Sequence, residues 1–182
     1  PDLFGEIAKD MPPEQAAGIL IHLPHDVRKV LVDHLPDEIK REIQELLQYP
    51  ENSAGRIMTT EYLAFHKEIK VKDAIQKIRA LASHHAPTTY TYVIDEAKHL
   101  LGVLNMRDLL LADGEAPVET IMKTNVFVVD GFMDREEVTH ELSRRHFFTA
   151  PVVDAEKRIL GVLKADVLIG ELQEEATEDI LK

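Results

Sequence analysis

The feature that most constrains the fold is a duplication that covers the chain beyond residue 56. The matching segments are 57–59 and 121–123, 92–95 and 151–154, 101–104 and 160–163, and 107–108 and 165–166. Between these marks each copy has one stretch with helical periodicity, over 71–82 in the first copy and opening at Asp134 in the second. Short apolar runs that end at Asp predict strands. Each copy therefore predicts the order strand, helix, strand, turn, strand, helix.

A shorter repeat occupies the N-terminal part of the chain. An apolar residue followed by Pro recurs every twelve residues, at positions 11, 23 and 35, with an acidic residue close behind. Pro in the first turn and acid near the start are typical of helix N-termini. We predict four short helices in a right-angled or superhelical array that ends near Leu47. Because such repeats need several copies to bury their faces, we expect further repeats upstream of Pro1.

Composition excludes several classes of function. The 182 residues include no Cys, which rules out disulfides, thiolate zinc sites and a cysteine nucleophile, and the nine His follow no zinc-ligand spacing. The net charge of −12 argues against nucleic acid as a partner. No apolar run approaches the roughly 18 residues that span a bilayer, so we expect a soluble chain. Since no nucleophile–base pair is evident, we expect no enzyme.

The duplicated unit resembles the CBS domain, and the whole chain resembles the intracellular part of MgtE magnesium transporters. The resemblance to MgtE rests on the repeats, on Ser-Ala-Gly-Arg-Ile-Met-Thr over 53–59 and on Glu-Ala-Thr-Glu-Asp-Ile over 175–180. It implies an α+β protein: an all-α superhelical N domain, a tandem CBS pair and a C-terminal connecting helix. The expected divisions are 1–49 for the N domain, 50–56 for a linker, 57–117 and 118–170 for the CBS domains, and 171–182 for the start of the connecting helix.

The resemblance also implies partners and a place in the cell. The chain is expected to form a homodimer through its CBS domains, to which apolar residues 127–129 would contribute surface. A transmembrane channel domain of the same chain is expected beyond Lys182, which would put this part at the cytoplasmic face of the membrane. Bound magnesium would favour the closed channel.

An acidic stripe near the C-terminus is the residue-level case for a metal. On a helix Glu171, Glu175 and Glu178 share one face, where like charges repel and a hard dication would relieve the repulsion. From the residues alone, a solvated helix face remains the alternative. The resemblance implies magnesium ligands at Asp10, Glu14, Gly55, Glu136, Glu175 and Glu178. Where the family commonly has Asp, this chain has His146, Val167 and Gly170, so we expect fewer or weaker sites.

A second function stays open at this point. CBS pairs often bind adenine nucleotides such as ATP, and the resemblance implies a ribose contact at Asp108 beside Arg107, with Phe147 stacking on the base. Asn105 stands where the family has a hydroxyl residue. The alternative to a magnesium sensor is therefore a stand-alone CBS regulatory module that binds adenine nucleotides.

Overall fold

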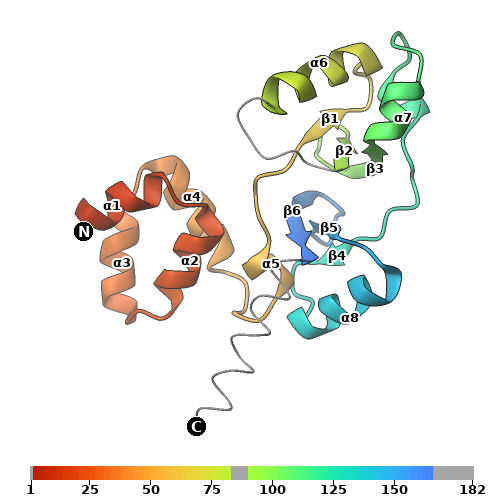
Figure 1. Ribbon diagram of the computed structural model, residues 1–182. Coiled ribbons are helices and arrows are strands. Elements are labelled where there is room, and N and C mark those ends of the chain that lie inside the picture. Colours follow the sequence, from red (N-terminus) through yellow and green to blue (C-terminus); the bar gives the residue numbers. More distant parts are fainter. Residues whose placement is uncertain (1, 83–89, 166–182) are drawn as a thin grey trace. The chain divides into compact units, whose positions relative to one another are not determined.

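The computed structural model describes residues 2–82 and 90–165 (Figure 1). These residues form two compact units. The first unit contains the chain up to Thr60, Val129–Val152 and the chain from Leu160; the second contains Glu61–Val128 and Val153–Ile159. Each unit combines helices with strands, as the α+β prediction requires. They are described separately.

The four predicted N-terminal helices are confirmed. They are α1 (Asp2–Lys9), α2 (Pro13–Ile21), α3 (His25–Asp33) and α4 (Asp37–Leu46). Pro12, Pro24 and Pro36 are the N-cap residues of α2, α3 and α4, with φ angles of −54°, −52° and −54°. The ring holds φ in this range, and the N–H that proline lacks would have had no partner inside the helix. The twelve-residue spacing of the prolines therefore sets the length of each helix.

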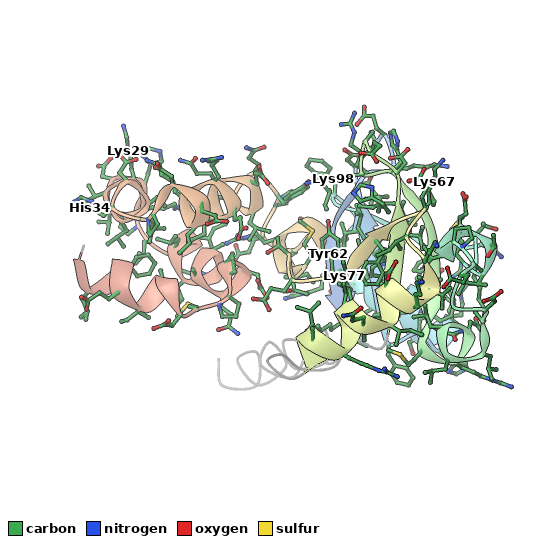
Figure 2. The ribbon with its side chains drawn as sticks, turned by 90° about the horizontal axis from the view of Figure 1, so that it is seen from above. Lys29, His34, Tyr62, Lys67, Lys77 and Lys98 are labelled. Atoms are coloured by element: carbon green, nitrogen blue, oxygen red, sulfur yellow. The ribbon has the colours of Figure 1, made fainter. Side chains whose placement is uncertain are left out.

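The helical array has its own apolar core. Helix α2 packs against α4, and α3 packs against α4. The buried apolar residues of these elements are Ala8, Ala16, Ala17, Leu20, Val32, Leu35, Ile43 and Leu46. Figure 2 shows Lys29 and His34 on the outer side of α3, and both are exposed. Each short helix thus contributes apolar residues to this core, although Ile19, Val27 and Val30 stay 46–47% exposed.

The first CBS copy is a three-stranded sheet with two helices, and it lies in the second unit. Its elements are β1 (Ala64–His66), α6 (Val71–Ala82), β2 (Tyr90–Ile94), β3 (Leu100–Asn105) and α7 (Met106–Leu111). The order is β1-β2-β3, with β1 and β2 parallel and β2 and β3 antiparallel. The core consists of Phe65, Val71, Ala74, Val93, Leu104, Leu109 and Val118, the last from the 3-10 helix η1 (Val118–Thr120).

The second copy repeats this order as far as the structure describes it. Its elements are β4 (Val129–Asp130), α8 (Arg135–Arg145), β5 (Thr149–Val153) and β6 (Ile159–Lys164), with sheet order β4-β5-β6. The predicted helix start at Asp134 is confirmed. Its side chain accepts a hydrogen bond of 2.8 Å from the N–H of Glu136, one residue before the position that a capping box would use.

The two copies exchange the segments that open them. Thr59 pairs with Val162 of β6 through two hydrogen bonds of 2.9 Å, and Lys123 pairs with Val103 of β3 through bonds of 3.0 and 2.9 Å. Segment 57–59 opens the first CBS domain along the chain, yet it extends the sheet of the second. Segment 121–123 likewise extends the sheet of the first. The predicted boundaries follow chain order, whereas strand pairing interleaves the copies.

A glycine permits each exchange. A Cβ added to Gly161 would lie 2.6 Å from the carbonyl oxygen of Thr59, and one added to Gly102 would lie 2.7 Å from Sδ of Met122. Real Cβ atoms do not approach other atoms so closely. The repeated Leu-Gly-Val-Leu motif is therefore explained by the close approach of a neighbouring backbone.

The segment predicted as a linker, 50–56, is partly built into the fold. Residues Ala54–Ile57 form the short helix α5, and Ser53, Ala54 and Arg56 are at most 4% exposed. Pro and Gly are typical of loops, which is why the segment reads as a linker. Here Gly55 instead allows contact with the ring of Tyr49, since a Cβ at Gly55 would lie 2.5 Å from that ring.

Candidate functional site

The carboxylate of Asp108 lies where β3 meets α7. Asn105 ends β3 and is the N-cap of α7. Its side-chain oxygen accepts from the N–H of Asp108 at 2.8 Å, and its Nδ2 donates to Oδ2 of Asp108 at 2.7 Å. An asparagine amide both accepts and donates, as a hydroxyl also can, so Asn105 can make both bonds to Asp108. The substitution noted in the sequence therefore orients the predicted ribose contact.

One cation lies beside this carboxylate. Nζ of Lys123 lies 3.7 Å from Oδ2 of Asp108, and the Lys123 side chain is 64% exposed. Arg107, the neighbour in the chain, is exposed. We did not predict Lys123 from the sequence. The signal was available, because the duplicated Ile-Met motif ends in Lys123 in one copy and in Thr59 in the other.

Phe147 lies in the other compact unit, just after α8. His146 ends that helix in the left-handed conformation, at φ 55°, and the N–H of Phe147 donates to the carbonyl of Leu142 at 3.0 Å. This geometry closes the helix and leaves the Phe147 side chain 44% exposed. Its predicted stacking on a base stays a prediction.

The predicted magnesium ligands are spread over several elements. Asp10 is exposed after α1, Glu14 is half-buried in the first turn of α2, and Glu136 is exposed in the first turn of α8. Gly55 is buried in α5. Glu175 and Glu178 lie outside the described residues.

The described residues alone do not make a metal cage. Within 2–82 and 90–165, no group of three or more His, Cys, Asp or Glu side chains could hold a metal ion. Magnesium commonly keeps several waters and binds through one or two carboxylates. The described acids therefore fit sites that hold a hydrated ion, and do not fit sites made wholly of protein ligands.

The structure does bring the elements of several candidates together in the first unit. The N–H of Gly55 donates to the carbonyl of Gly131 at 2.7 Å, and the N–H of Arg135 donates to the carbonyl of Asn52 at 2.8 Å. The Tyr49 ring lies 5.0 Å from that of Phe132. The segment that carries Gly55 is thus fixed beside the start of α8, the helix that carries Glu136.

Arg56 links the same segment to α2, and sequence reasoning missed it. Arg56 is 4% exposed, and its guanidinium donates to the carbonyl of Ala17 in α2. Arg28 donates to the carbonyls of Ile21 and Leu23 at 2.9 and 3.1 Å. Two cations at the C-terminal half of α2 complement its dipole. Burial lowers the pKa of Arg56.

Family comparisons divide the chain in the same order as the fold. The model of the MgtE intracellular N domain matches residues 1–52, and that of the CBS domain matches 54–115 and 118–174. No helix in the described part of the chain is long and apolar enough to cross a membrane.

Individual relatives agree with this assignment. "Magnesium transporter MgtE" of Bacillus subtilis is 39% identical over 140 residues, which are 77% of this chain and 31% of that protein. The same-named protein of Thermus thermophilus is 38% identical over 152 residues, 84% of this chain and 34% of that protein. The chain therefore spans about a third of the length of these curated relatives.

Solved structures extend the match to three dimensions. The cytosolic domain of the Mg2+ channel MgtE in complex with ATP has a TM-score of 0.82 at 32% identity, covering 92% of this chain and 68% of that one. The soluble part of a magnesium transporter has a TM-score of 0.85 at 29% identity, covering 94% and 67%. This chain belongs to the MgtE family and corresponds to its cytosolic part, an intracellular N domain followed by a CBS pair.

Proposed function

We propose that this chain is the magnesium-sensing regulatory part of a magnesium transporter. The observation that carries the proposal is the meeting of three sequence-distant segments in the first unit. Arg56 bonds α5 to α2, and backbone bonds join residues 52–55 to 131–135. Acids on these elements, Glu14 and Glu136, belong to one folded unit, so a charge change on one element acts on the others.

Electrostatics supplies the switch. The chain carries a net charge of −12, and carboxylates drawn together without a counterion repel one another. In the proposed mechanism a hydrated magnesium ion relieves that repulsion. Asp10, Glu14, Glu136 and the backbone of Gly55 would contribute ligands, and Glu175 and Glu178 of the connecting segment would complete the sites. In the whole transporter, the compact ion-bound arrangement would favour the closed channel.

Small-angle scattering tests this mechanism. We expect the chain to have a smaller radius of gyration in millimolar magnesium than in chelator, because ligation replaces repulsion. Potassium chloride at equal ionic strength is the control, since screening alone would act alike for both salts. An identical radius with magnesium and with chelator would refute the sensor mechanism for this chain.

A matched pair of variants assigns the effect to residues. The variant with Glu136, Glu175 and Glu178 all changed to Gln should stay folded and lose the magnesium response. Its control changes the exposed Glu68, Glu96 and Glu119 of the second unit to Gln, which alters the net charge equally. If both variants lose the response alike, the charge total matters and the proposed ligands do not.

A second function, binding of an adenine nucleotide, is favoured by the geometry at Asp108. Asn105 orients a carboxylate that can accept hydrogen bonds from ribose hydroxyls, and a relative of the same family has been crystallised with ATP. Calorimetry should detect ATP binding that Asp108→Asn weakens and the exposed-site control Glu119→Gln leaves unchanged. Equal binding by Asp108→Asn and the unaltered chain would remove Asp108 from the site.

Homodimerisation through the CBS domains is also proposed. Val129, which was expected to supply apolar surface, is fully buried, so that part of the expectation is wrong. Other large apolar side chains are exposed, notably Leu110, Leu111 and Phe148 at 62%, 76% and 76%. Sedimentation equilibrium at micromolar concentration should give a dimer; a monomer under these conditions would contradict the proposal.

A further inference from the structure

We propose that Lys123 makes the site at Asp108 selective for nucleotides that carry phosphate over the corresponding nucleosides. This inference rests on the proposed nucleotide binding and adds the class of ligand. It is carried by the backbone that holds Lys123, the atom of Asp108 that Lys123 approaches, and the residue that replaces Lys123 in the other CBS copy.

The backbone of Lys123 is held beside β3. Its N–H donates to the carbonyl of Val103 at 2.9 Å and its carbonyl accepts from the N–H of Val103 at 3.0 Å. Gly102 permits this approach, because a Cβ there would lie 2.9 Å from the carbonyl oxygen of Lys123. The lysine is therefore anchored at its Cα, next to the strand that leads into Asn105 and Asp108, while its side chain reaches solvent.

The carboxylate is only partly occupied. Both side-chain contacts that the structure gives Asp108, from Nδ2 of Asn105 at 2.7 Å and from Nζ of Lys123 at 3.7 Å, fall on Oδ2. Within the described residues Oδ1 is thus left to accept from a ligand. An ammonium 3.7 Å from one oxygen is not a full hydrogen bond. It can turn toward a phosphate adjoining a ribose held on Oδ1, without disrupting the bond from Asn105.

The positive charge of Lys123 favours binding of a phosphate group. A nucleoside phosphate approaching a chain with a net charge of −12 needs local positive potential, which Lys123 and the exposed Arg107 provide. Lys is a common phosphate ligand because its ammonium acts as a compact point charge. A neutral nucleoside gains nothing from that charge. Lys123 should therefore act on the phosphate and leave recognition of the nucleoside to other groups.

The second copy provides an internal comparison. Thr59 holds the position of Lys123 there and pairs with Val162 as Lys123 pairs with Val103, but it is only 9% exposed. A buried hydroxyl cannot supply the long-range attraction of an exposed ammonium. At this motif position an exposed ammonium is thus found in the first copy, to which the inference applies.

Calorimetry with ATP, AMP and adenosine tests the inference on the unaltered chain, Lys123→Gln and Lys123→Arg. Lys77→Gln is the matched control, because it removes the same charge from an exposed position on α6 of the same unit (Figure 2). We expect Lys123→Gln to weaken ATP and AMP binding by about tenfold, the loss expected for one charge-assisted hydrogen bond. Adenosine affinity should not fall, Lys123→Arg should retain most of the ATP affinity, and Lys77→Gln should match the unaltered chain.

Each of the other outcomes contradicts the inference. If the unaltered chain binds ATP and Lys123→Gln binds it equally well, or loses adenosine and ATP affinity alike, the inference is wrong and nucleotide binding stands. If Lys77→Gln weakens ATP binding as much as Lys123→Gln does, total charge accounts for the effect and the inference is again wrong. If the unaltered chain binds none of the three ligands, the proposed nucleotide function fails and the inference fails with it.

Discussion

The two CBS copies share one backbone plan and differ in charge at the start of their first helices. Lys70 and Lys72 flank the first residue of α6, whereas Asp134 and Glu136 flank the first residue of α8. Both helix starts are held by the segment preceding the other copy's Ile-Met motif. The N–H of Val71 donates to the carbonyl of Ala116, and that of Arg135 donates to the carbonyl of Asn52. The same backbone arrangement thus carries two lysines at the start of α6 and two acids at the start of α8.

The residue before each of those carbonyls completes the contrast. Glu115 bonds to Lys70 at 2.8 Å and to Lys72 at 2.5 Å, and the Lys70 bond, followed by that of Lys72, lowers the pKa of Glu115 to about 2. The counterpart of Glu115 is Glu51, which precedes Asn52, the residue whose carbonyl holds the start of α8. There Asp134 and Glu136 stand in place of the two lysines. In the first copy two lysines therefore pair with one acid, whereas the start of α8 in the second copy carries two acids, Asp134 and Glu136. Glu136, the magnesium ligand that the resemblance implies in the second copy, lies at the helix start that lacks these lysines.

The largest effects should come from equivalent core leucines. Leu104 and Leu163 hold the same place in the repeated Leu-Gly-Val-Leu motif, and each is 1% exposed. Replacing either with Ala should lower the free energy of unfolding by about 2–5 kcal/mol, through lost burial and a cavity. Urea unfolding followed by circular dichroism measures this, with the 70% exposed Leu3→Ala as control. A loss in one copy only would break the structural equivalence of the two sheets.

The two motif glycines come next. Gly161→Ala should destabilise the chain by about 1–3 kcal/mol, because the new Cβ meets a backbone oxygen that cannot move aside. Gly102→Ala should cost less, since its new Cβ would lie 2.9 Å from the nearest backbone atom, the carbonyl oxygen of Lys123, against 2.6 Å at Gly161. Gly18→Ala in α2 is the control: its Cβ would meet nothing within 4 Å, so Ala should stabilise that helix by roughly 0.5–1 kcal/mol. Thermal unfolding of the three variants measures the order of their stabilities. A Gly161→Ala variant as stable as the unaltered chain would contradict the close approach of segment 57–59 to Gly161.

Helix caps should give smaller losses. Asp134 caps α8 and Asn105 caps α7, each through one side-chain hydrogen bond of 2.8 Å to a backbone N–H. Changing either to Ala should lower the free energy of unfolding by about 0.5–2 kcal/mol. Hydrogen exchange of the first-turn amides should rise in the affected helix. Unchanged exchange at Glu136 in Asp134→Ala would show that the cap of the second copy is not formed.

The smallest effect should appear as acid sensitivity. The native pKa of Glu115 is depressed, so its contribution to stability is present above the ordinary glutamate pKa and is lost as pH falls toward about 2. Glu115→Gln removes that contribution, so its stability should decline less than that of the unaltered chain over this acid range. Melting temperatures from neutral to acid pH measure it, and Glu119→Gln, exposed in the same unit, is the control. Parallel curves for Glu115→Gln and the unaltered chain would mean that the lysines do not hold Glu115 in solution.

Much of this molecule follows from its sequence because the responsible interactions are local. Proline at positions 12, 24 and 36 sets φ within its own residue, so the twelve-residue spacing predicts the four helices. Likewise the Asp134 cap acts two residues away, and alternation and helical periodicity state which side of each element is apolar. The duplication then requires two similar α/β units, and the family resemblance follows from the same motifs.

Tertiary structure alone decided which partners meet across the chain. Nothing local distinguishes a segment 57–59 that pairs within its own copy from one that pairs with β6, since both choices satisfy the same backbone groups. Gly55 reads as a linker glycine because its reason, the Tyr49 ring, is a spatial neighbour. Arg56 and Lys123 read as ordinary charges until folding places one beside the α2 carbonyl of Ala17 and the other beside Asp108. The strength of an electrostatic interaction depends on the distance between the charges and on their burial. The tertiary structure sets both.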